Sequence, residues 1–210
     1  MGVVKAGVLG GTFDPVHNGH IAMARESRDR LGLDYVVFVP AGNPWLKSDV
    51  PVTPAEQRFE MVKLAVGPYP YFKVSRIEID RSGPSYTVDT VKELKSRSDA
   101  KLEIFFILGW DSFIQLPRWH KVSGLVKLCR LVAIPRPGSA PPDLIALEKE
   151  IPGISQSVIL LDTPQIDISA TDIRDRVTHG LSLNGVVPDA VENYIREKGL
   201  YRDDTGSCSQ

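Results

Sequence analysis

The chain has 210 residues, of which 42% are hydrophobic, and its 25 Lys and Arg are nearly balanced by 26 Asp and Glu. This profile is that of an ordinary globular chain, with one domain as the default. Because non-specific nucleic-acid binding needs a broad positive surface, a formal net charge of -1 argues against it. The apolar runs are far shorter than the roughly 20 residues that a membrane-spanning helix needs, so we expect no membrane insertion.

The sequence also indicates a cellular compartment. The N-terminal stretch runs into glycines and an Asp before a signal-peptide core can form, and the two cysteines, Cys129 and Cys208, have no CxxC spacing. We therefore expect a cytoplasmic protein without a disulfide or a structural zinc site.

Short apolar runs rich in Val, Ile and Phe recur along the chain, at 3–9, 34–39, 71–79, 102–108, 130–134 and 157–161. Helix-length amphipathic segments lie between most of them, and this alternation predicts an α/β fold with a doubly wound parallel sheet. The runs VVFVP and LEIFFIL are apolar almost throughout, which is typical of central strands covered on both faces.

Capping residues predict where two early helices lie. The first should begin near Asn18 and end before Gly32. The second begins at the series Thr53-Pro54-Ala55-Glu56, which offers a hydroxyl as N-cap, a proline at the first helical position and a Glu that reaches back.

The C-terminal part is predicted to be helical. The series Ser169-Ala170-Thr171-Asp172 has the form of a capping box, with Gly180 as the stop, and a last helix covers 188–198 and ends at Gly199. We expect a single domain over residues 1–201, with its helical part from about 165 to 201, and a disordered tail over 202–210.

The most informative segment is GGTFDPVHNGH, residues 10–20, between the first strand and the first helix. Glycines there let backbone N–H groups approach a ligand, and the helix start behind them presents unpaired donors and a positive dipole end. His17 and His20 are three residues apart, so they project from one face and can direct two ring nitrogens at the same ligand. Asp14 is expected to fix the loop by accepting backbone hydrogen bonds. Jointly these residues predict an anion site rather than turn glycines and capping histidines alone.

The segment is neither a Walker loop nor a GxGxxG dinucleotide fingerprint, which disfavours kinases and dehydrogenases. Instead, His17-Asn18-Gly19-His20 resembles the signature of the HxGH nucleotidyltransferases, and residues 10–20 are similar to the form found in bacterial nicotinate-nucleotide adenylyltransferases. A second signature of that family, ISxTxIR, is matched by residues 168–174, and SYTVDT at 85–90 with LPRW at 116–119 narrows the resemblance to the pyridine-nucleotide branch. The resemblance spans roughly residues 3–201.

The resemblance implies a Rossmann-like nucleotidyltransferase fold and adenylyl transfer from ATP to nicotinate mononucleotide, with release of pyrophosphate, in NAD biosynthesis. It implies no general base, because a phosphate monoester is already a nucleophilic anion. The family uses magnesium, and since no carboxylates have metal-ligand spacing, we expect Mg²⁺ to be carried by the ATP phosphates and water, with no ligands from the protein.

The resemblance also implies roles for individual residues. Those expected to bind ATP are Gly10, Gly11, Thr12, Phe13, Ser169, Thr171 and Arg174. Those expected to bind the mononucleotide are Ser85, Tyr86, Thr87, Asp111 and Trp119, the last by stacking on the pyridine ring. Those expected to be catalytic are His17, His20, Arg174 and Lys47. The family often has Pro-His-Lys where this chain has Trp45-Leu46-Lys47, so the Lys carries over and the His does not.

Each assignment has a plainer alternative: a solvated Lys47, a core Trp119, an N-cap Asp111 or a well-capped surface helix at 169–174. Trp110 is expected to pack in the core, and His120 and His179 are expected to be structural or solvent-facing. Rival functions are adenylyl transfer to nicotinamide mononucleotide or to phosphopantetheine, and a non-catalytic nucleotide-binding regulatory module. A homo-oligomer is left open, because no apolar stripe can be separated from the core.

Overall fold

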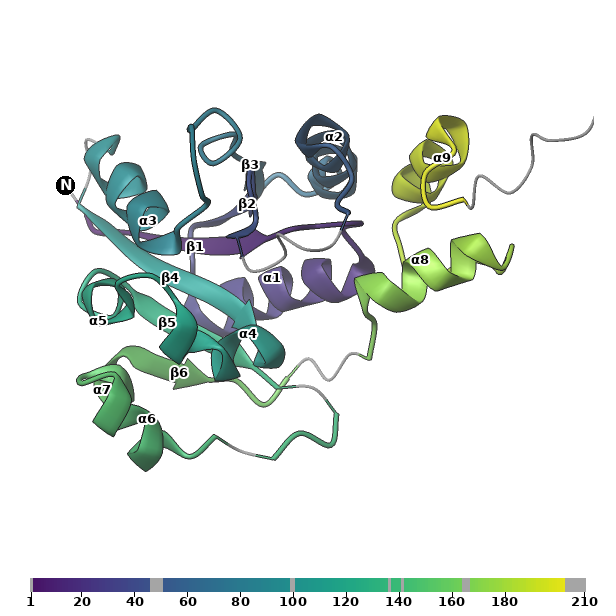
Figure 1. The fold of residues 1–210 in the computed structure, drawn as a ribbon. Coiled ribbons are helices and arrows are strands. Elements are labelled where there is room, and N and C mark those ends of the chain that lie inside the picture. The colour runs from purple at the N-terminus through teal and green to yellow at the C-terminus, as the bar shows by residue number, and fades with distance from the viewer. Residues whose placement is uncertain are drawn as a thin grey trace, which may run out of the picture.

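The computed structural model describes residues 2–45, 51–98, 101–135, 137–140, 142–163 and 167–202. Within these ranges six parallel strands form one sheet in the order β3-β2-β1-β4-β5-β6 (Figure 1). The strands are β1 (Val4–Gly11), β2 (Tyr35–Pro40), β3 (Phe72–Val74), β4 (Leu102–Gly109), β5 (Arg130–Ile134) and β6 (Val158–Leu160). The order reverses between β1 and β4, as in doubly wound sheets, so the predicted fold class is confirmed.

Helices join and flank the strands. They are α1 (Asn18–Leu31), α2 (Ala55–Val66), α3 (Thr87–Ser96), α4 (Trp110–Ile114), α5 (Val122–Leu125), α6 (Leu144–Glu150), α7 (Ile154–Ser157), α8 (Ala170–Thr178) and α9 (Asp189–Lys198), with a 3-10 helix, η2 (Leu116–Arg118), after α4. None of the helices in the described ranges has the length and apolar character needed to cross a membrane.

Alternate side chains of the central strands enter two separate cores, because successive residues of a strand point to opposite faces. Leu9 and Phe38 pack on the face covered by α1, α2, α8 and α9. Val8 and Val37 pack on the other face, against α3, α4, α5 and α7. Covered on both faces, β2 and β4 are the central, nearly continuous apolar strands that the sequence predicts, and β1 lies between them.

The predicted helix termini are confirmed for α1, α8 and α9. Gly32 and Gly199 are left-handed C-caps of α1 and α9, and the Ser169 hydroxyl accepts a hydrogen bond from the Asp172 amide at the start of α8. In Figure 1, α8 and α9 lie at the end of the molecule toward which the strand arrows point. That end is the carboxyl edge of the sheet, where parallel α/β folds bind ligands.

Two expectations are wrong in detail. Of the predicted run 71–79, β3 comprises Phe72–Val74, because the chain then turns, with the Arg76 carbonyl accepting from the amides of Ile79 and Asp80. Helix α2 has Pro54 rather than Thr53 as its N-cap, and the Glu56 carboxylate pairs with the Arg76 guanidinium at 2.6 and 2.8 Å instead of reaching back. A local turn ends β3, whereas at the start of α2 a contact with a distant residue overrides the local pattern.

Candidate active site

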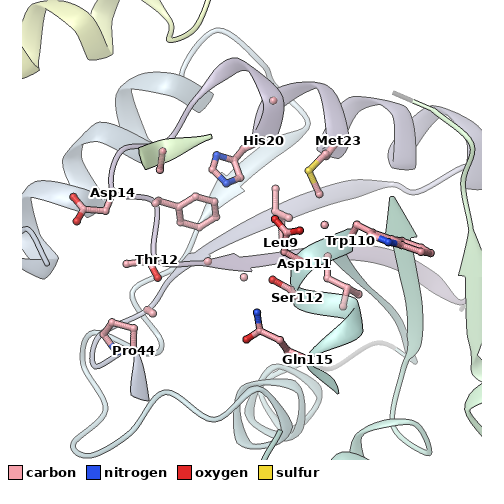
Figure 2. A pocket seen from close by; sticks show the side chains of 18 of the residues that line it. Leu9, Thr12, Asp14, His20, Met23, Pro44, Trp110, Asp111, Ser112 and Gln115 are labelled. Atoms are coloured by element: carbon pink, nitrogen blue, oxygen red, sulfur yellow. The ribbon is translucent and has the colours of Figure 1, made fainter. Parts of the chain in front are cut away.

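A cavity of about 560 Å³ opens at the carboxyl ends of β1 and β4, where the winding of the sheet reverses. The ends of these strands, the first turns of α1 and α4, the loop after β2 and residues 168–171 all contribute to its walls. In Figure 2, His20 and Met23 of α1 face Asp111, Ser112 and Gln115 across this space. A crevice at this position is where doubly wound sheets hold nucleotides.

The loop that follows β1 is tightly constrained. A Cβ atom on Gly10 would lie 2.9 Å from Cζ of Phe106, so any other residue where β1 meets the cavity would require the Phe106 ring to shift. Phe13 has φ of 53°, the left-handed region that an aromatic residue rarely adopts, and its side chain is buried. Conformations of this kind persist when the surrounding structure holds them in place, and they concentrate at functional sites.

The two histidines of the HNGH segment lie together. His17 is the N-cap of α1 and is buried, and the centroids of the His17 and His20 rings are 3.6 Å apart. Nδ1 of His20 accepts a hydrogen bond from the backbone amide of His17 at 3.2 Å, so the proton of the neutral His20 ring is on Nε2. His20 therefore carries its ring proton on Nε2, at the first turn of α1 and beside the positive end of a 14-residue helix.

Arg58 is a buried cation behind the loop, 1% exposed. Its guanidinium donates to four carbonyl oxygens on three segments: Thr12 at 2.6 Å, Thr53 at 2.7 Å, and Ala41 and Gly42 at 2.7 and 3.5 Å. Burial lowers the pKa of Arg58, while the charge of Asp14 opposes that effect. Arg58 thus joins the loop after β1 to the loop after β2.

The prediction that Asp14 fixes the loop through a backbone hydrogen bond is confirmed. Its Oδ2 accepts from the Thr53 amide at 3.2 Å. Two further contacts come from the C-terminal part: Oδ1 accepts from the Tyr201 hydroxyl at 2.7 Å, and the Asp14 carbonyl accepts from Nη1 of Arg174 at 2.8 Å.

The start of α8 forms another wall of the cavity. Ser169 and Thr171 line it, and the Ser169 hydroxyl donates to the Asp172 carboxylate at 2.6 Å. Arg174 lies one turn further along, where Nη2 donates to Thr171 Oγ1 at 3.3 Å and Nη1 reaches Asp14. These contacts use two of the five N–H donors of the guanidinium.

At the other end of the cavity, Ser85 and Thr87 stand at the start of α3. The Ser85 amide donates to the Asn43 carbonyl at 3.0 Å, and the Asn43 amide donates to the Ser85 hydroxyl at 3.1 Å. The Tyr86 amide donates to the Pro84 carbonyl at 3.0 Å. The amides of Ser85 and Tyr86 are therefore engaged within the protein, and Thr87 is the first residue of the helix itself.

Aromatic side chains surround this end. Trp119 lines the cavity, and the Phe106 and Trp119 rings meet edge to face, with centroids 6.0 Å apart. Tyr86 lies behind the wall, where its ring stacks on His120 at 4.1 Å and meets the edge of Trp45 at 5.8 Å. His120 was expected to be structural or solvent-facing; it is exposed, and its ring packs on Tyr86.

Glu78 is a buried carboxyl in the same wall, 8% exposed. It accepts a hydrogen bond from the Thr90 hydroxyl at 2.6 Å and another from the Ser85 hydroxyl. Burial raises the pKa of Glu78, and both hydrogen bonds and the charge of Arg81 oppose that rise. A Cβ atom on Gly42 would lie 2.1 Å from the Glu78 carbonyl oxygen, so the loop after β2 rests directly on this segment.

The raised pKa of Glu78 predicts a pH dependence of stability. Between the ordinary pKa of about 4.5 and the higher folded value, the folded state binds more protons than the unfolded state, so the contribution of Glu78 to stability falls as pH rises. We expect the melting temperature of Glu78→Gln, relative to the parent protein, to increase from pH 4 to pH 8. Thermal unfolding across that range measures the difference, and a constant difference would contradict the expected burial cost.

Most of the residues predicted for the site line one cavity: Gly10, Gly11, Thr12, Phe13, His17, His20, Ser85, Thr87, Asp111, Trp119, Ser169 and Thr171. Tyr86 and Arg174 lie beside it, at the contacts given above. Lys47, predicted to be catalytic, lies outside the described residues, as does the predicted tail from 203 onward.

Sequence reasoning missed Arg58, Glu78 and Tyr201. A signal for Arg58 exists, because it precedes Met61 and Val62 by three and four residues and so shares the apolar face of α2. Among the described residues, no group of three or more His, Cys, Asp or Glu is arranged to hold a metal ion. Asp14 is already hydrogen-bonded to protein through both carboxylate oxygens.

The comparisons with known proteins agree with this geometry. The cytidylyltransferase-like family model matches residues 8–176. A relative from Dehalococcoides mccartyi (strain CBDB1), named "Probable nicotinate-nucleotide adenylyltransferase", is 52% identical over 198 residues, which cover 94% of this chain and 97% of the relative. A relative of the same name from Moorella thermoacetica is 43% identical over 202 residues, covering 94% and 92%.

Among solved structures, the fold is similar to that of Plasmodium falciparum nicotinic acid mononucleotide adenylyltransferase complexed with NaAD, with a TM-score of 0.77 at 20% identity over 94% of this chain and 97% of that chain. That likeness concerns the fold, whereas the bacterial relatives align along nearly their whole length at far higher identity. The resemblance found in the sequence is thereby confirmed, and the chain belongs to the nicotinate-nucleotide adenylyltransferase family within the cytidylyltransferase-like proteins.

Proposed function

We propose that the cavity transfers the adenylyl group of ATP to nicotinate mononucleotide, giving nicotinate adenine dinucleotide and pyrophosphate. A phosphate oxygen of the mononucleotide attacks the α-phosphorus, a P–O bond forms, and the bond from the α-phosphorus to the bridging oxygen of the leaving pyrophosphate breaks. The observation that carries the proposal is that the paired histidines and the start of α8 share one cavity with Thr87 and Trp119.

The residues near α1 would stabilise the leaving pyrophosphate. Nε2–H of His20 and the positive end of α1 lie at one wall of the cavity, and negative charge accumulates on the pyrophosphate as the bond breaks. Ser169, Thr171 and Arg174, in the first turns of α8, would hold the β- and γ-phosphates. Lys47 is proposed as a further phosphate partner on the sequence resemblance alone.

The other end would hold the mononucleotide. With the Ser85 and Tyr86 amides engaged by carbonyls, we assign the nicotinate carboxylate to the Thr87 end of α3, where a helix start favours an anion. Trp119 would stack on the pyridine ring, and Asp111 would lie between the two nucleotide halves.

Magnesium would accompany the triphosphate, where it would neutralise phosphate charge. The described residues suit a metal carried by phosphate and water, because no cluster of protein ligands is present among them and Asp14 is engaged by Thr53 and Tyr201. We propose Mg²⁺ as that ion.

An acceptor panel tests the proposal. Pyrophosphate release is measured with ATP and Mg²⁺ and, in turn, nicotinate mononucleotide, nicotinamide mononucleotide and phosphopantetheine. We expect the highest kcat/KM with nicotinate mononucleotide. A preference for either other acceptor would reassign the substrate, and ATP binding without turnover on any acceptor would favour a regulatory module.

Stacking on Trp119 predicts a selective effect. Trp119→Ala should raise the KM for nicotinate mononucleotide about tenfold, because stacking of a ring on an aromatic face contributes about 1–3 kcal/mol. The KM for ATP should change less than about twofold, and Trp119→Phe should restore most of the loss. Steady-state kinetics with each substrate varied in turn measure both constants; equal increases in the two would refute the assignment.

A further inference from the structure

The turn at Phe13 and Asp14 is held by residues from the far end of the chain. Asp14 is 5% exposed, and in Figure 2 its side chain points away from the other labelled residues of the cavity. Its carboxylate is therefore not directed at the ligand space, although it belongs to the loop that borders that space. The hydrogen-bond partners of the Asp14 carboxylate lie on the side of the loop that faces away from the cavity.

Both carboxylate oxygens of Asp14 have a donor. Oδ1 accepts from the Tyr201 hydroxyl at 2.7 Å, and Oδ2 accepts from the Thr53 amide at 3.2 Å. The Tyr201 hydroxyl is buried in this contact, and burial, with the charge of Asp14 as a second cause, raises the pKa of Tyr201. The hydroxyl therefore keeps its proton and remains a donor to the carboxylate at neutral pH.

The C-terminal part also holds the start of α1. The Asn18 amide donates to the Val186 carbonyl at 2.9 Å, and Nδ2 of Asn18 donates to the Gly185 carbonyl at 2.9 Å. Between Asp14 and Asn18 lies the N-cap His17. The segment that carries the histidines is thus fixed on both sides by residues from 185 to 201.

The turn is coupled to His20 by packing. The Phe13 ring meets the His20 ring edge to face, with centroids 4.9 Å apart, and Phe13 itself is in the left-handed region. A non-glycine residue keeps this conformation only while its neighbours hold it. Movement of Asp14 would therefore shift Phe13 and, through it, the imidazole of His20.

We propose that Tyr201 is a positioning residue for the ATP end of the cavity: its hydroxyl acts through the Asp14 carboxylate to keep Phe13 and His20 in the geometry that the triphosphate requires. The inference rests on the proposed adenylyl transfer. It gives the C-terminal residues a part in the reaction without any contact with substrate. Tyr201 belongs to the same chain segment that follows α9, so the role is available within one subunit.

The test is Tyr201→Phe, which removes one oxygen atom and keeps the ring. Loss of a buried hydrogen bond to a carboxylate should lower kcat/KM for ATP about tenfold, while the KM for nicotinate mononucleotide stays within about twofold, because Thr87 and Trp119 stand at the other end of the cavity. Tyr194→Phe is the matched control, since Tyr194 packs against the same core and loses the same atom; we expect it to leave both constants unchanged.

A double-mutant cycle with Asp14→Ala tests the route. If Tyr201 acts through Asp14, Tyr201→Phe should cost less than about twofold in the Asp14→Ala background. Circular dichroism at the assay temperature shows which variants are folded. If Asp14→Ala does not fold, the comparison of Tyr201→Phe with Tyr194→Phe still tests whether Tyr201 positions the ATP end of the cavity. Equal kinetics for the two tyrosine variants, a matching rise in the KM for the mononucleotide, or additive effects in the cycle would overturn the proposal.

Measurements on the wild-type chain distinguish a failure of the proposed function from a failure of the proposed role of Tyr201. If it shows no turnover with any acceptor, the proposed function fails, and Tyr201 is then judged by calorimetric titration with ATP and Mg²⁺, in which Tyr201→Phe should bind about tenfold more weakly than Tyr194→Phe. If the wild type turns over and Tyr201→Phe matches it, the positioning role fails and the function stands.

Discussion

His20→Ala is expected to reduce kcat for pyrophosphate release by about 10²–10³, the usual cost of removing one preorganised donor to a group that gains negative charge. The reason is geometric: the His17 amide donates to Nδ1, so the proton of the neutral His20 ring is on Nε2, and His20 lines the cavity in which the phosphates are proposed to lie. The KM for nicotinate mononucleotide should change little, because His20 lies at the α1 end of the cavity. Single-turnover and steady-state rates with saturating substrates measure the effect.

The matched control is His179→Ala. His179 is exposed at the end of α8, with Nδ1 2.7 Å from the Asp175 carbonyl oxygen, and its loss should leave kcat unchanged. His20→Ala that retains more than a tenth of the parent kcat would remove the histidine from the proposed chemistry. A parallel loss in His179→Ala would indicate a general effect of losing an imidazole.

The largest effect on stability is expected for Arg58→Met. Methionine fills most of the space but donates no hydrogen bond, so the carbonyls of Thr12, Ala41 and Thr53 would be left without the guanidinium. Each buried acceptor without a partner costs about 1–3 kcal/mol. We therefore expect the free energy of unfolding to fall by about 3–5 kcal/mol and the melting temperature by roughly 10 °C.

Urea denaturation and thermal unfolding measure this loss. Arg58→Lys should fall between the parent and Arg58→Met, because an ammonium group cannot reproduce the fork geometry of a guanidinium. Lys63→Met on the same helix is the control: Lys63 is exposed and its ion pair with Glu60 at 3.3 Å contributes little. If Arg58→Met is no less stable than Lys63→Met, the buried contacts do not stabilise the loops as described.

The features that could be predicted from the sequence are those set by neighbours along the chain. The run LEIFFIL is predicted to be a covered strand because it is apolar almost throughout, and Gly32 and Gly199 end helices because they accept left-handed backbone. His17 and His20 could be placed together because they are three residues apart on one helix turn. In each case the determining contacts lie within a few residues.

The features that could not be predicted depend on contacts between distant segments. Thr53 has the form of an N-cap, yet its amide and carbonyl are drawn to Asp14 and Arg58. The contact between Tyr201 and Asp14 joins residues 187 positions apart, and no local pattern specifies it. The amides at Ser85 and Tyr86 looked suited to an anion, but the Asn43 and Pro84 carbonyls already accept from them.

The contact between Gly42 and Glu78 has a mechanical consequence. The two backbones are in direct contact there, and two hydrogen bonds between Asn43 and Ser85 extend the contact. Residues 41–43 therefore cannot separate from residues 78–85 without breaking these contacts. When a substrate enters, these two segments would have to move together, which limits how far this wall of the cavity can change shape.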